Sequence, residues 1–456
     1  MASKEPEKRA KKTAERTAKK AVKQAAKKHP GAVIAIVVIL VILIAVGVVL
    51  YLKVDAVQQM INGIINPPSE TATVDDGGSG NLSGTGDGGT SSETATVEDG
   101  GTSSETATVD DGDTSSGADA PPKATTYGDK DLSFHFLELG NNYTGDSTYI
   151  KAGDVDILID AGSRQNSAAT IASEVDKYCT DGTLEFVIAT HAHQDHIAGF
   201  TNTKTNDGIF KRYECEVIID FALTNATSAT YNNYVTAREA EVALGAKHYT
   251  ALDCVKGLNG AQQTYELGEG MSMTILYQKF YENTSGDENN YSVCVLFNHG
   301  DNYYLLTGDL EADGEASLVE NNDLPEVQLF KAGHHGSYTA TTDALLSVIK
   351  PKIVCVCCCA GAVEYTQNSA NTFPSQAFID RVAPYTARVY VTTVGTVTYN
   401  EEKGKYEDVG FASMNGNITV LSSGGKVTVR CSDNDTLLKD TEWFAANRTR
   451  PPAWAA

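Results

Sequence analysis

The chain has 456 residues and a formal net charge of −23 at pH 7, which is spread unevenly along it. Residues 1–53 carry +9, residues 54–128 carry −12, and residues 129–456 carry −20. The acidic C-terminal part argues against a binder of long polyanions, because affinity for nucleic acid comes mostly from lysine and arginine side chains that neutralise phosphates. The length allows one large domain, or two small ones, with appended segments.

The N-terminal segment has the pattern of a membrane anchor. Residues 1–30 form a basic tail, and residues 31–52 contain no charged side chain. A helix over this second stretch is about 33 Å long, which matches the core of a bilayer, and the stretch is longer than the core of a cleaved signal peptide. By the positive-inside rule we expect a single-pass signal anchor with a cytoplasmic N-terminus, so that the rest of the chain is extracellular.

Residues 53–127 are predicted to be a disordered linker. The stretch is rich in Gly, Ser, Thr, Asp and Glu, and the segment that begins at Glu70 recurs almost unchanged from Glu93 and from Glu105. Such a composition cannot bury enough apolar surface to offset the entropy of the chain. A coil of this length spans on the order of 40 Å. We therefore expect a spacer that holds a folded domain away from the membrane.

The folded domain is predicted over residues 128–432, and residues 433–456 have no pattern that assigns them a role. Runs typical of strands outnumber helical patterns, and helices lie between them. The class that fits is α/β, with sheets covered by helices. Strands are expected at 132–137, 148–150, 156–160, 185–190, 216–221, 273–277, 292–298, 303–307, 327–330 and 352–358, and helices at 168–178, 236–244, 313–320, 341–349 and 375–382.

Three histidines and an aspartate follow the predicted strand 185–190 directly, in the pattern HxHxDH. His191 and His193 point the same way from an extended segment, so they can share one metal ion. Asp195 and His196 can turn toward a second ion. Imidazole and carboxylate ligands suit Zn²⁺ well, and Mn²⁺ or Fe also fit.

Two later segments place more polar side chains at the ends of predicted strands. Asp309 ends an apolar strand after a glycine and can bridge two cations. His334 and His335 follow another apolar strand, and one of them can complete the second metal site. The sequence does not decide which, and His334 is the predicted ligand. The other histidine can hold a substrate anion together with Lys331 and Ser337.

These motifs resemble the metallo-β-lactamase fold, and more closely the hydrolase domain of the ComEC/Rec2 competence proteins and their stand-alone relatives. The resemblance covers about residues 131–430 and implies an αββα sandwich that holds two divalent ions, Zn or Mn, or one such ion. The resemblance does not include the channel region of the competence proteins. We therefore expect this chain to have the hydrolase function of those proteins and not their role as a DNA pore. The matching motifs are HxHxDH, TGD, HHGS, Leu158-Ile159-Asp160-Ala161-Gly162, the strand 136–140, the turn Gly145-Asp146-Ser147 and the Asn-rich segment 289–292.

The chain departs from the resemblance in its histidines. Many members of the superfamily carry another metal-binding histidine between HxHxDH and the bridging aspartate. The histidines available here are His248 and His299, which we expect at the surface. Relatives also carry a later His-Pro motif, where this chain has Phe373-Pro374. We therefore expect a site that is poor in ligands.

The resemblance implies hydrolysis by a metal-bound hydroxide, because such ions lower the pKa of bound water toward neutrality. We expect Asp195 to orient this hydroxide, and His335 or Lys331 to stabilise charge or protonate the leaving group. Ser337 and Asn290 are expected to contact the substrate. The predicted substrate is a phosphodiester, either extracellular DNA or a smaller ester such as phosphocholine on a wall polymer, and the acidic charge favours the smaller ester. The alternative is a catalytically degenerate binding or surface module.

The nine cysteines are an odd number, so that at least one is unpaired within the chain. Four of them lie between Cys355 and Cys359 in an apolar run. This pattern predicts small buried residues rather than a metal site or a cluster of disulfides. Free thiols outside the cell would suit an anaerobic habitat, which is a hypothesis.

Overall fold

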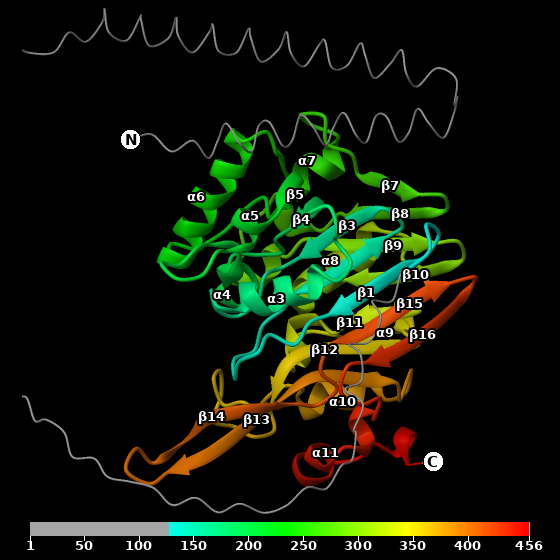
Figure 1. Cartoon of the computed structure of the whole chain (residues 1–456). Coiled ribbons are helices and arrows are strands. Elements are labelled where there is room, and N and C mark those ends of the chain that lie inside the picture. The colour runs from blue at the N-terminus through cyan, green and yellow to red at the C-terminus, as the bar shows by residue number, and fades with distance from the viewer. Residues whose placement is uncertain (1–126, 456) are drawn as a thin grey trace, which may run out of the picture. The chain divides into compact units, whose positions relative to one another are not determined.

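The computed structural model describes residues 127–455, which form two eight-stranded sheets packed face to face (Figure 1). The predicted basic tail, the predicted membrane span and nearly all of the predicted linker lie outside the described residues. None of the helices between residues 127 and 455 has the length and apolar character that a bilayer crossing requires.

The first sheet has the strand order β16-β15-β1-β2-β3-β4-β5-β6. Strands β3 to β6 run parallel, and the remaining neighbours are antiparallel. Strands β3, β4 and β5 each contain buried apolar residues in sequence, at 157–159, 187–188 and 218–219, because both of their faces are covered. The bounds are β1 Leu132–Phe136, β2 Thr148–Ala152, β3 Val155–Ile159, β4 Thr183–Ile188, β5 Glu214–Asp220, β6 Lys247–Thr250, β15 Ile418–Ser423 and β16 Lys426–Cys431.

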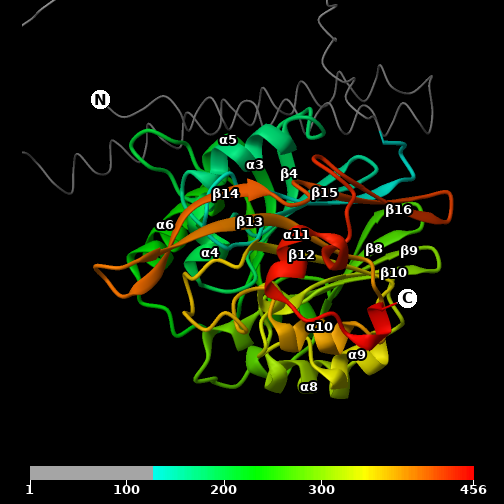
Figure 2. The ribbon, with the colours of Figure 1, turned by 90° about the horizontal axis from the view of Figure 1, so that it is seen from below.

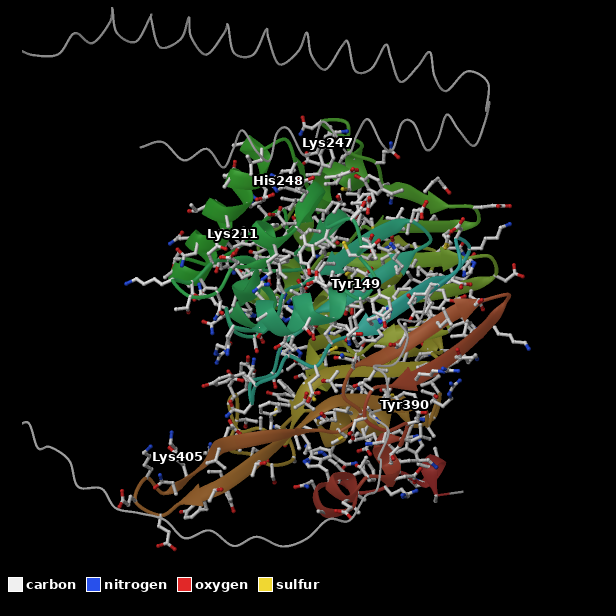
Figure 3. All side chains as sticks on the ribbon, in the orientation of Figure 1. Tyr149, Lys211, Lys247, His248, Tyr390 and Lys405 are labelled. Carbon is white, nitrogen blue, oxygen red and sulfur yellow. The ribbon has the colours of Figure 1, made fainter. Side chains whose placement is uncertain are left out.

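The second sheet has the strand order β14-β13-β12-β11-β10-β9-β8-β7, in which β10 to β13 run parallel. Strands β13 and β14 form a long hairpin that extends beyond the rest of the sheet, with Lys405 near its tip (Figure 3). The bounds are β7 Thr264–Gly268, β8 Met271–Leu276, β9 Cys294–His299, β10 Asn302–Leu306, β11 Leu329–Lys331, β12 Ile353–Ala360, β13 Val389–Asn400 and β14 Lys405–Ser413.

Helices cover the outer face of each sheet, so that the order of layers is αββα (Figure 2). Several of them begin at a serine or threonine whose side chain accepts a hydrogen bond from the first turn, as for α6, α7, α9, α10 and α11. The bounds are α3 Ser167–Val175, α4 Gln194–Ile197, α5 Ile209–Arg212, α6 Ala229–Ala243, α7 Ala251–Lys256, α8 Ala312–Asn321, α9 Asp343–Ile349, α10 Gln376–Val382 and α11 Glu442–Asn447. The predicted α/β sandwich is confirmed.

Aromatic rings join the two sheets across the core. Phe134 of β1 packs against two rings of the second sheet, with ring centroids 5.3 Å from Phe297 and 4.8 Å from Tyr304. All three side chains are fully buried. These contacts pack β1 of the first sheet against β9 and β10 of the second sheet, and they help to hold the two sheets together.

The C-terminal segment after residue 432 packs into the hydrophobic cluster between the second sheet and its covering helices. Leu438, Phe444 and Trp454 are buried there, and the Trp454 indole N–H donates to the carbonyl of Thr386 at 2.9 Å. The sequence assigned no role to this segment because its buried residues stand singly, without a helical or strand period.

Arg448 fastens this C-terminal segment to the loop before α10. Burial lowers the pKa of its guanidinium to about 10, yet its donors all reach oxygen atoms, among them the carbonyls of Pro374, Ser369 and Thr372. We expect Arg448→Ala to lower the free energy of unfolding by about 3 kcal/mol, because several buried acceptors lose their donor. Urea denaturation measures this loss. Arg450→Ala is the matched control at a half-exposed arginine, and an equal loss in both variants would contradict the assignment.

His135 is a fully buried histidine on β1, and its Nε2 lies 3.0 Å from the Ser133 hydroxyl. Burial, reinforced by the positive charge of Lys177, lowers the pKa of His135 to about 3. Between this value and the ordinary value near 6.5 the unfolded chain binds one more proton than the folded chain. The stabilising contribution is therefore complete above pH 6.5 and is lost as the pH falls toward 3.

We expect the free energy of unfolding to fall by about 1.4 kcal/mol per pH unit through this group below pH 6.5. Urea denaturation at pH 7 and at pH 5 measures the fall. His135→Gln removes the titrating group and keeps an amide that can bond to Ser133. The free energy of unfolding of this variant should therefore fall less between pH 7 and pH 5, because the loss of about 1.4 kcal/mol per pH unit below pH 6.5 is absent. Identical pH dependence in the two proteins would refute this origin.

All nine cysteines are free, and eight of them are buried, with Cys431 partly exposed. The four cysteines between Cys355 and Cys359 lie in β12, where every residue is buried. Burial raises the pKa of the Cys359 thiol to about 12. The prediction of small buried residues in this strand is confirmed.

Candidate metal centre

The residues of the candidate centre stand where parallel strands end. The HxHxDH segment follows β4, Asp160 follows the neighbouring β3, Asp309 follows β10, and the His334-His335 pair follows the neighbouring β11. Neighbouring parallel strands end at one edge of a sheet, and functional sites of α/β folds form outside such edges. Docking of the two sheets brings both edges together.

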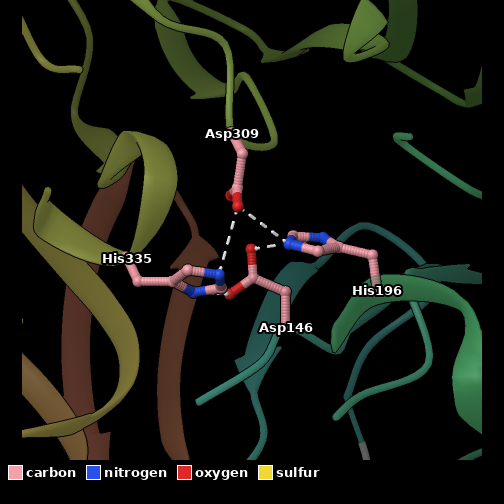
Figure 4. A group of neighbouring side chains, drawn as sticks. All are labelled: Asp146, His196, Asp309 and His335. Atoms are coloured by element: carbon pink, nitrogen blue, oxygen red, sulfur yellow. Dashed lines mark hydrogen bonds and ion pairs between the residues drawn. The ribbon is translucent and has the colours of Figure 1, made fainter. Parts of the chain in front are cut away.

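Asp309 contacts both His196 and His335 (Figure 4). Its Oδ2 is 3.0 Å from the His196 Nε2 and 3.1 Å from the His335 Nε2. Asp195 completes the group, because its Oδ2 is 3.3 Å from the same His335 nitrogen. Ligand atoms bound at about 2.1 Å to one ion lie roughly 3 Å apart. The Asp309 Oδ2, the His196 Nε2 and the His335 Nε2 therefore have the spacing of ligands on a single divalent ion, and the Asp195 carboxylate lies beside His335.

Two further histidine nitrogens lie near Asp309. The His191 Nε2 is 3.0 Å from the His193 Nδ1 and 4.0 Å from the Asp309 Oδ2. His191 is fully buried, whereas His193 is exposed. Asp309 thus has nitrogen atoms of three histidines within 4.0 Å, and its role as a bridge between two ions stays a prediction.

The ring nitrogens that face away from the centre are held by oxygen atoms. The His196 Nδ1 is 2.7 Å from the Asp160 Oδ2, and the His335 Nδ1 is 2.8 Å from the carbonyl of Cys357 and 3.2 Å from the Asp146 Oδ1. Such contacts fix the tautomer and the orientation of metal-binding histidines. Asp146 lies in the compact group with His196, Asp309 and His335, but it faces their outer nitrogens and so orients them.

Orphaned buried atoms show that these residues fit a cation. Three buried atoms of the centre make no hydrogen bond of good geometry within the described residues. They are the Asp309 Oδ1, the His335 Nε2 and the Asp146 Oδ1. A buried polar atom without a partner costs about 1–3 kcal/mol. A divalent ion offers the missing partner to the Asp309 and His335 atoms.

Negative charge dominates the electrostatics of the centre. Burial alone would lower the pKa values of His196 and His335, but Asp309, with Asp160 beside one and Asp146 beside the other, outweighs burial and raises both pKa values well above their usual range. The centre is therefore built to hold positive charge. Binding of a metal to these two imidazoles releases the protons that they otherwise carry.

His335, and not the predicted ligand His334, belongs to this group. The His334 Nδ1 is 3.0 Å from the Glu311 Oε1 and 3.0 Å from the Thr339 hydroxyl. Both histidines have positive φ angles, 46° and 54°, in the turn Gly333–Gly336, so that the two side chains leave the backbone in different directions. The sequence pattern alone does not reveal this turn.

Lys331 does not face a substrate. Its side chain is buried, its ammonium contacts the Asp146 carboxylate, and it lies 3.6 Å from the Asp309 Oδ1. The prediction that Lys331 stabilises charge on the substrate or protonates the leaving group is therefore corrected. Lys331 is a buried positive charge that pairs with Asp146. The His335 Nε2 faces Asp309 and Asp195, at 3.1 Å and 3.3 Å, so His335 is placed as a candidate metal ligand rather than beside a leaving group.

The two predicted substrate-contacting residues are buried and bonded within the protein. The Ser337 hydroxyl is 2.9 Å from the Thr339 hydroxyl, and the Asn290 Oδ1 accepts from the Glu311 amide at 3.3 Å. Both positions brace the turn that carries His335 and the segment after Asp309, and neither side chain has a contact with the ligand group.

His248 and His299 lie outside the centre. The His248 Nε2 is 2.7 Å from the Asp220 Oδ1, beside α6 (Figure 3), and the His299 Nδ1 is 2.9 Å from the Ser422 hydroxyl. Phe373 occupies the place next to the centre, with its ring centroid 5.7 Å from that of His335. No additional histidine within residues 127–455 joins the ligands described above.

Tyr365 is a site residue that the sequence did not reveal. Its hydroxyl donates to the Asp195 Oδ2 at 2.8 Å. It lies in a loop after β12 without a motif, so no sequence signal points to it. Asp146 and Asp160 did carry a signal, because they follow a glycine turn and an apolar strand, respectively, in the segments that carried the family resemblance.

The fold and the site define a metallo-β-lactamase-type α/β sandwich with a candidate metal centre. In agreement, residues 140–204 match the family model described as the Metallo-beta-lactamase superfamily. The chain is 31% identical over 114 residues to Recombination protein 2 of Haemophilus influenzae, and 30% identical over 115 residues to ComE operon protein 3 of Bacillus subtilis. The resemblance to ComEC-like proteins is thereby confirmed.

Each of these two matches covers 25% of this chain but only 13% and 14% of the respective relative, so the chain corresponds to a small part of those proteins. Among solved structures, a metallo-beta-lactamase of Cronobacter sakazakii with an HARLDQ motif has a TM-score of 0.27 at 14% identity, covering 43% of this chain and 72% of its own. The subclass B3 enzyme MEM-A1 from a soil metagenome library has a TM-score of 0.29 at 12% identity, covering 44% and 76%.

Proposed function

We propose that this protein is a metal-dependent hydrolase of phosphodiesters, held at the outer face of the cell membrane by its N-terminal segment. The observation that carries the hydrolase is that His196 and His335 both contact Asp309, that His335 also contacts Asp195, and that buried atoms there lack a partner. Divalent ions bound at such a centre provide a nucleophilic water at neutral pH and polarise a phosphoryl oxygen.

The chain's own residues prepare this chemistry. Asp160 and the Cys357 carbonyl orient the two buried imidazoles, and Tyr365 together with His335 holds the Asp195 carboxylate. Because these contacts exist before any substrate arrives, little reorganisation is needed during the reaction. His193 and Tyr365 are the exposed members of the site, so a substrate approaches from their side.

The substrate class follows from similarity and charge. The likeness to Recombination protein 2 and ComE operon protein 3 favours a phosphodiester, which is a bond of nucleic acids. The charge of −20 over residues 129–456 disfavours long polyanions, because two divalent ions offset only a small part of it. A short oligonucleotide, a nucleotide ester or a phosphocholine ester on a wall polymer agrees better with this surface.

The membrane location rests on the charge pattern of residues 1–52. A protease added to intact cells tests it, because an exported domain is cut off while an internal one is protected. Protection of the domain in intact cells, with cleavage after lysis, would rule the proposed topology out without affecting the hydrolase proposal.

Metal content and turnover test the activity. The full chain is purified, its bound metal is quantified, and hydrolysis of bis-(p-nitrophenyl) phosphate is followed with and without added Mn²⁺ or Zn²⁺. We expect metal-dependent turnover that is lost in Asp195→Ala. Bound metal without turnover would exclude phosphodiesters in favour of another ester, and the absence of both would leave the degenerate binding module as the better account.

A further inference from the structure

Tyr365 connects the candidate centre to solvent. Its hydroxyl donates to the Asp195 Oδ2 at 2.8 Å, while its side chain is 52% exposed. One end of the ring is thus fixed on a residue of the ligand group, and a large part of the ring remains open. Among the large hydrophobic residues that are exposed within residues 127–455, Tyr365 alone bonds to a residue of this group.

A series of ring contacts leads from Tyr365 through Phe373 to the histidines. The Tyr365 ring centroid is 5.6 Å from that of Phe373, which is 5.5 Å from His334 and 5.7 Å from His335. Phe373 is buried between Tyr365 and the two histidines, and its ring packs against theirs. A planar group that stacks on the open face of Tyr365 therefore lies beside the metal ligands.

The loop that carries Tyr365 is held in place on both sides of it. The Glu364 carboxylate accepts from the Arg164 guanidinium at 2.8 Å and from the Thr144 amide at 3.2 Å. The Gln367 side-chain amide bonds to both the N–H and the carbonyl of Tyr406 in β14. A ring that is held this firmly and still left half open costs little entropy when a ligand packs against it.

Exposed tyrosines are common on proteins, and most have no ligand. Tyr399 on the β13–β14 hairpin is 50% exposed and contacts only the neighbouring Tyr406 ring among the rings described. Tyr365 differs from Tyr399 in its hydroxyl contact with Asp195 and in its aromatic support. This difference makes Tyr399 a matched control.

We propose that Tyr365 contacts the substrate and selects phosphate esters that carry an aromatic ring, such as a nucleobase, next to the phosphate. The open face of Tyr365 stacks on that ring, and its hydroxyl keeps Asp195 in place. The proposal deepens the proposed function and rests on it for the identity of the ester. Stacking of a base on an aromatic side chain changes affinity by about 10-fold to 100-fold.

Binding by the Mn²⁺-loaded full chain tests the ring without requiring turnover. Calorimetry compares thymidine 5′-monophosphate with 2-deoxyribose 5-phosphate, which has the same phosphate and sugar but no base. We expect the unaltered protein to prefer the nucleotide by about 10-fold to 100-fold. Tyr365→Ala should lose this preference, whereas Tyr365→Phe and Tyr399→Ala should keep it.

Kinetics separates the hydroxyl from the ring. With bis-(p-nitrophenyl) phosphate we expect Tyr365→Phe to lower kcat by about 10-fold to 100-fold with little change in KM, because Asp195 loses its donor. Tyr365→Ala should in addition raise KM. Metal content is measured for each variant, so that a loss of metal is not mistaken for a loss of contact.

The outcomes distinguish this inference from the proposed function. Absence of a base preference in the unaltered protein, or its persistence in Tyr365→Ala, would overturn the inference even if phosphodiesters are hydrolysed. A base preference that disappears in Tyr365→Ala supports the inference even if bis-(p-nitrophenyl) phosphate is not hydrolysed, and in that case only the proposed activity fails.

Discussion

Asp309→Asn should abolish stoichiometric metal binding and lower turnover by at least about 1,000-fold. The Asp309 Oδ2 is within 3.1 Å of both the His196 and the His335 Nε2, and it is 4.0 Å from the His191 Nε2. An amide keeps the shape of the carboxylate but removes the negative charge that faces the three histidines and would hold the metal ion.

Metal analysis, turnover and thermal unfolding check this expectation together. A metal that binds only the folded chain raises its stability by about 2.7 kcal/mol at one hundred times Kd, so a chelator should lower the Tm of the unaltered protein and leave that of Asp309→Asn nearly unchanged. Asp301→Asn makes the same chemical change in the exposed turn between β9 and β10 and serves as the control. Full metal content in Asp309→Asn would disprove the bridging position.

Lys331→Met should lower the free energy of unfolding by about 3–5 kcal/mol, the cost of breaking a buried ion pair. The Lys331 ammonium and the Asp146 carboxylate are in contact and nearly inaccessible to solvent. Burial alone would lower the pKa of Lys331, but Asp146 and then Asp309 outweigh it and raise that pKa. Removal of the ammonium takes the closest positive charge away from the buried Asp146 carboxylate and leaves it with the more distant imidazoles of His335 and His196.

The double variant Asp146→Asn/Lys331→Met should recover much of this loss, because it removes both charges at once. Urea denaturation of the two single variants and the double variant gives the coupling between the residues. Lys403→Met, at an exposed lysine that pairs with Glu407, should change stability far less. Additive losses in the double variant would show that the two side chains do not act as a pair.

Long apolar runs made most of the first twelve strands predictable. The strands from β1 to β5 and from β8 to β12 were located to within a few residues, because each is an apolar run bounded by turn residues. Strands β13 to β16 were missed. In β14 most side chains are exposed, and the sequence between Lys405 and Ser413 has no period that distinguishes a strand from a loop.

The site was predictable where residue types are rare and closely spaced. HxHxDH and the aspartate after β10 identified His191, His193, Asp195, His196 and Asp309, and the structure brings these together. The choice between the two adjacent histidines depends on left-handed backbone angles, which no side-chain pattern encodes. The contact of Tyr365 with Asp195 joins residues 170 positions apart, so it is a product of tertiary packing.

The ligands of the centre are divided between the two sheets. His191, His193, Asp195 and His196 come from the half that ends at β6, whereas Asp309 and His335 come from the half that begins at β7. A bound ion would therefore act as a cross-link across the seam of the sandwich, and neither half alone could assemble the centre. A chain cut between α7 and β7 would keep each set of ligands intact, and the reassembly of its two fragments would then depend on metal concentration.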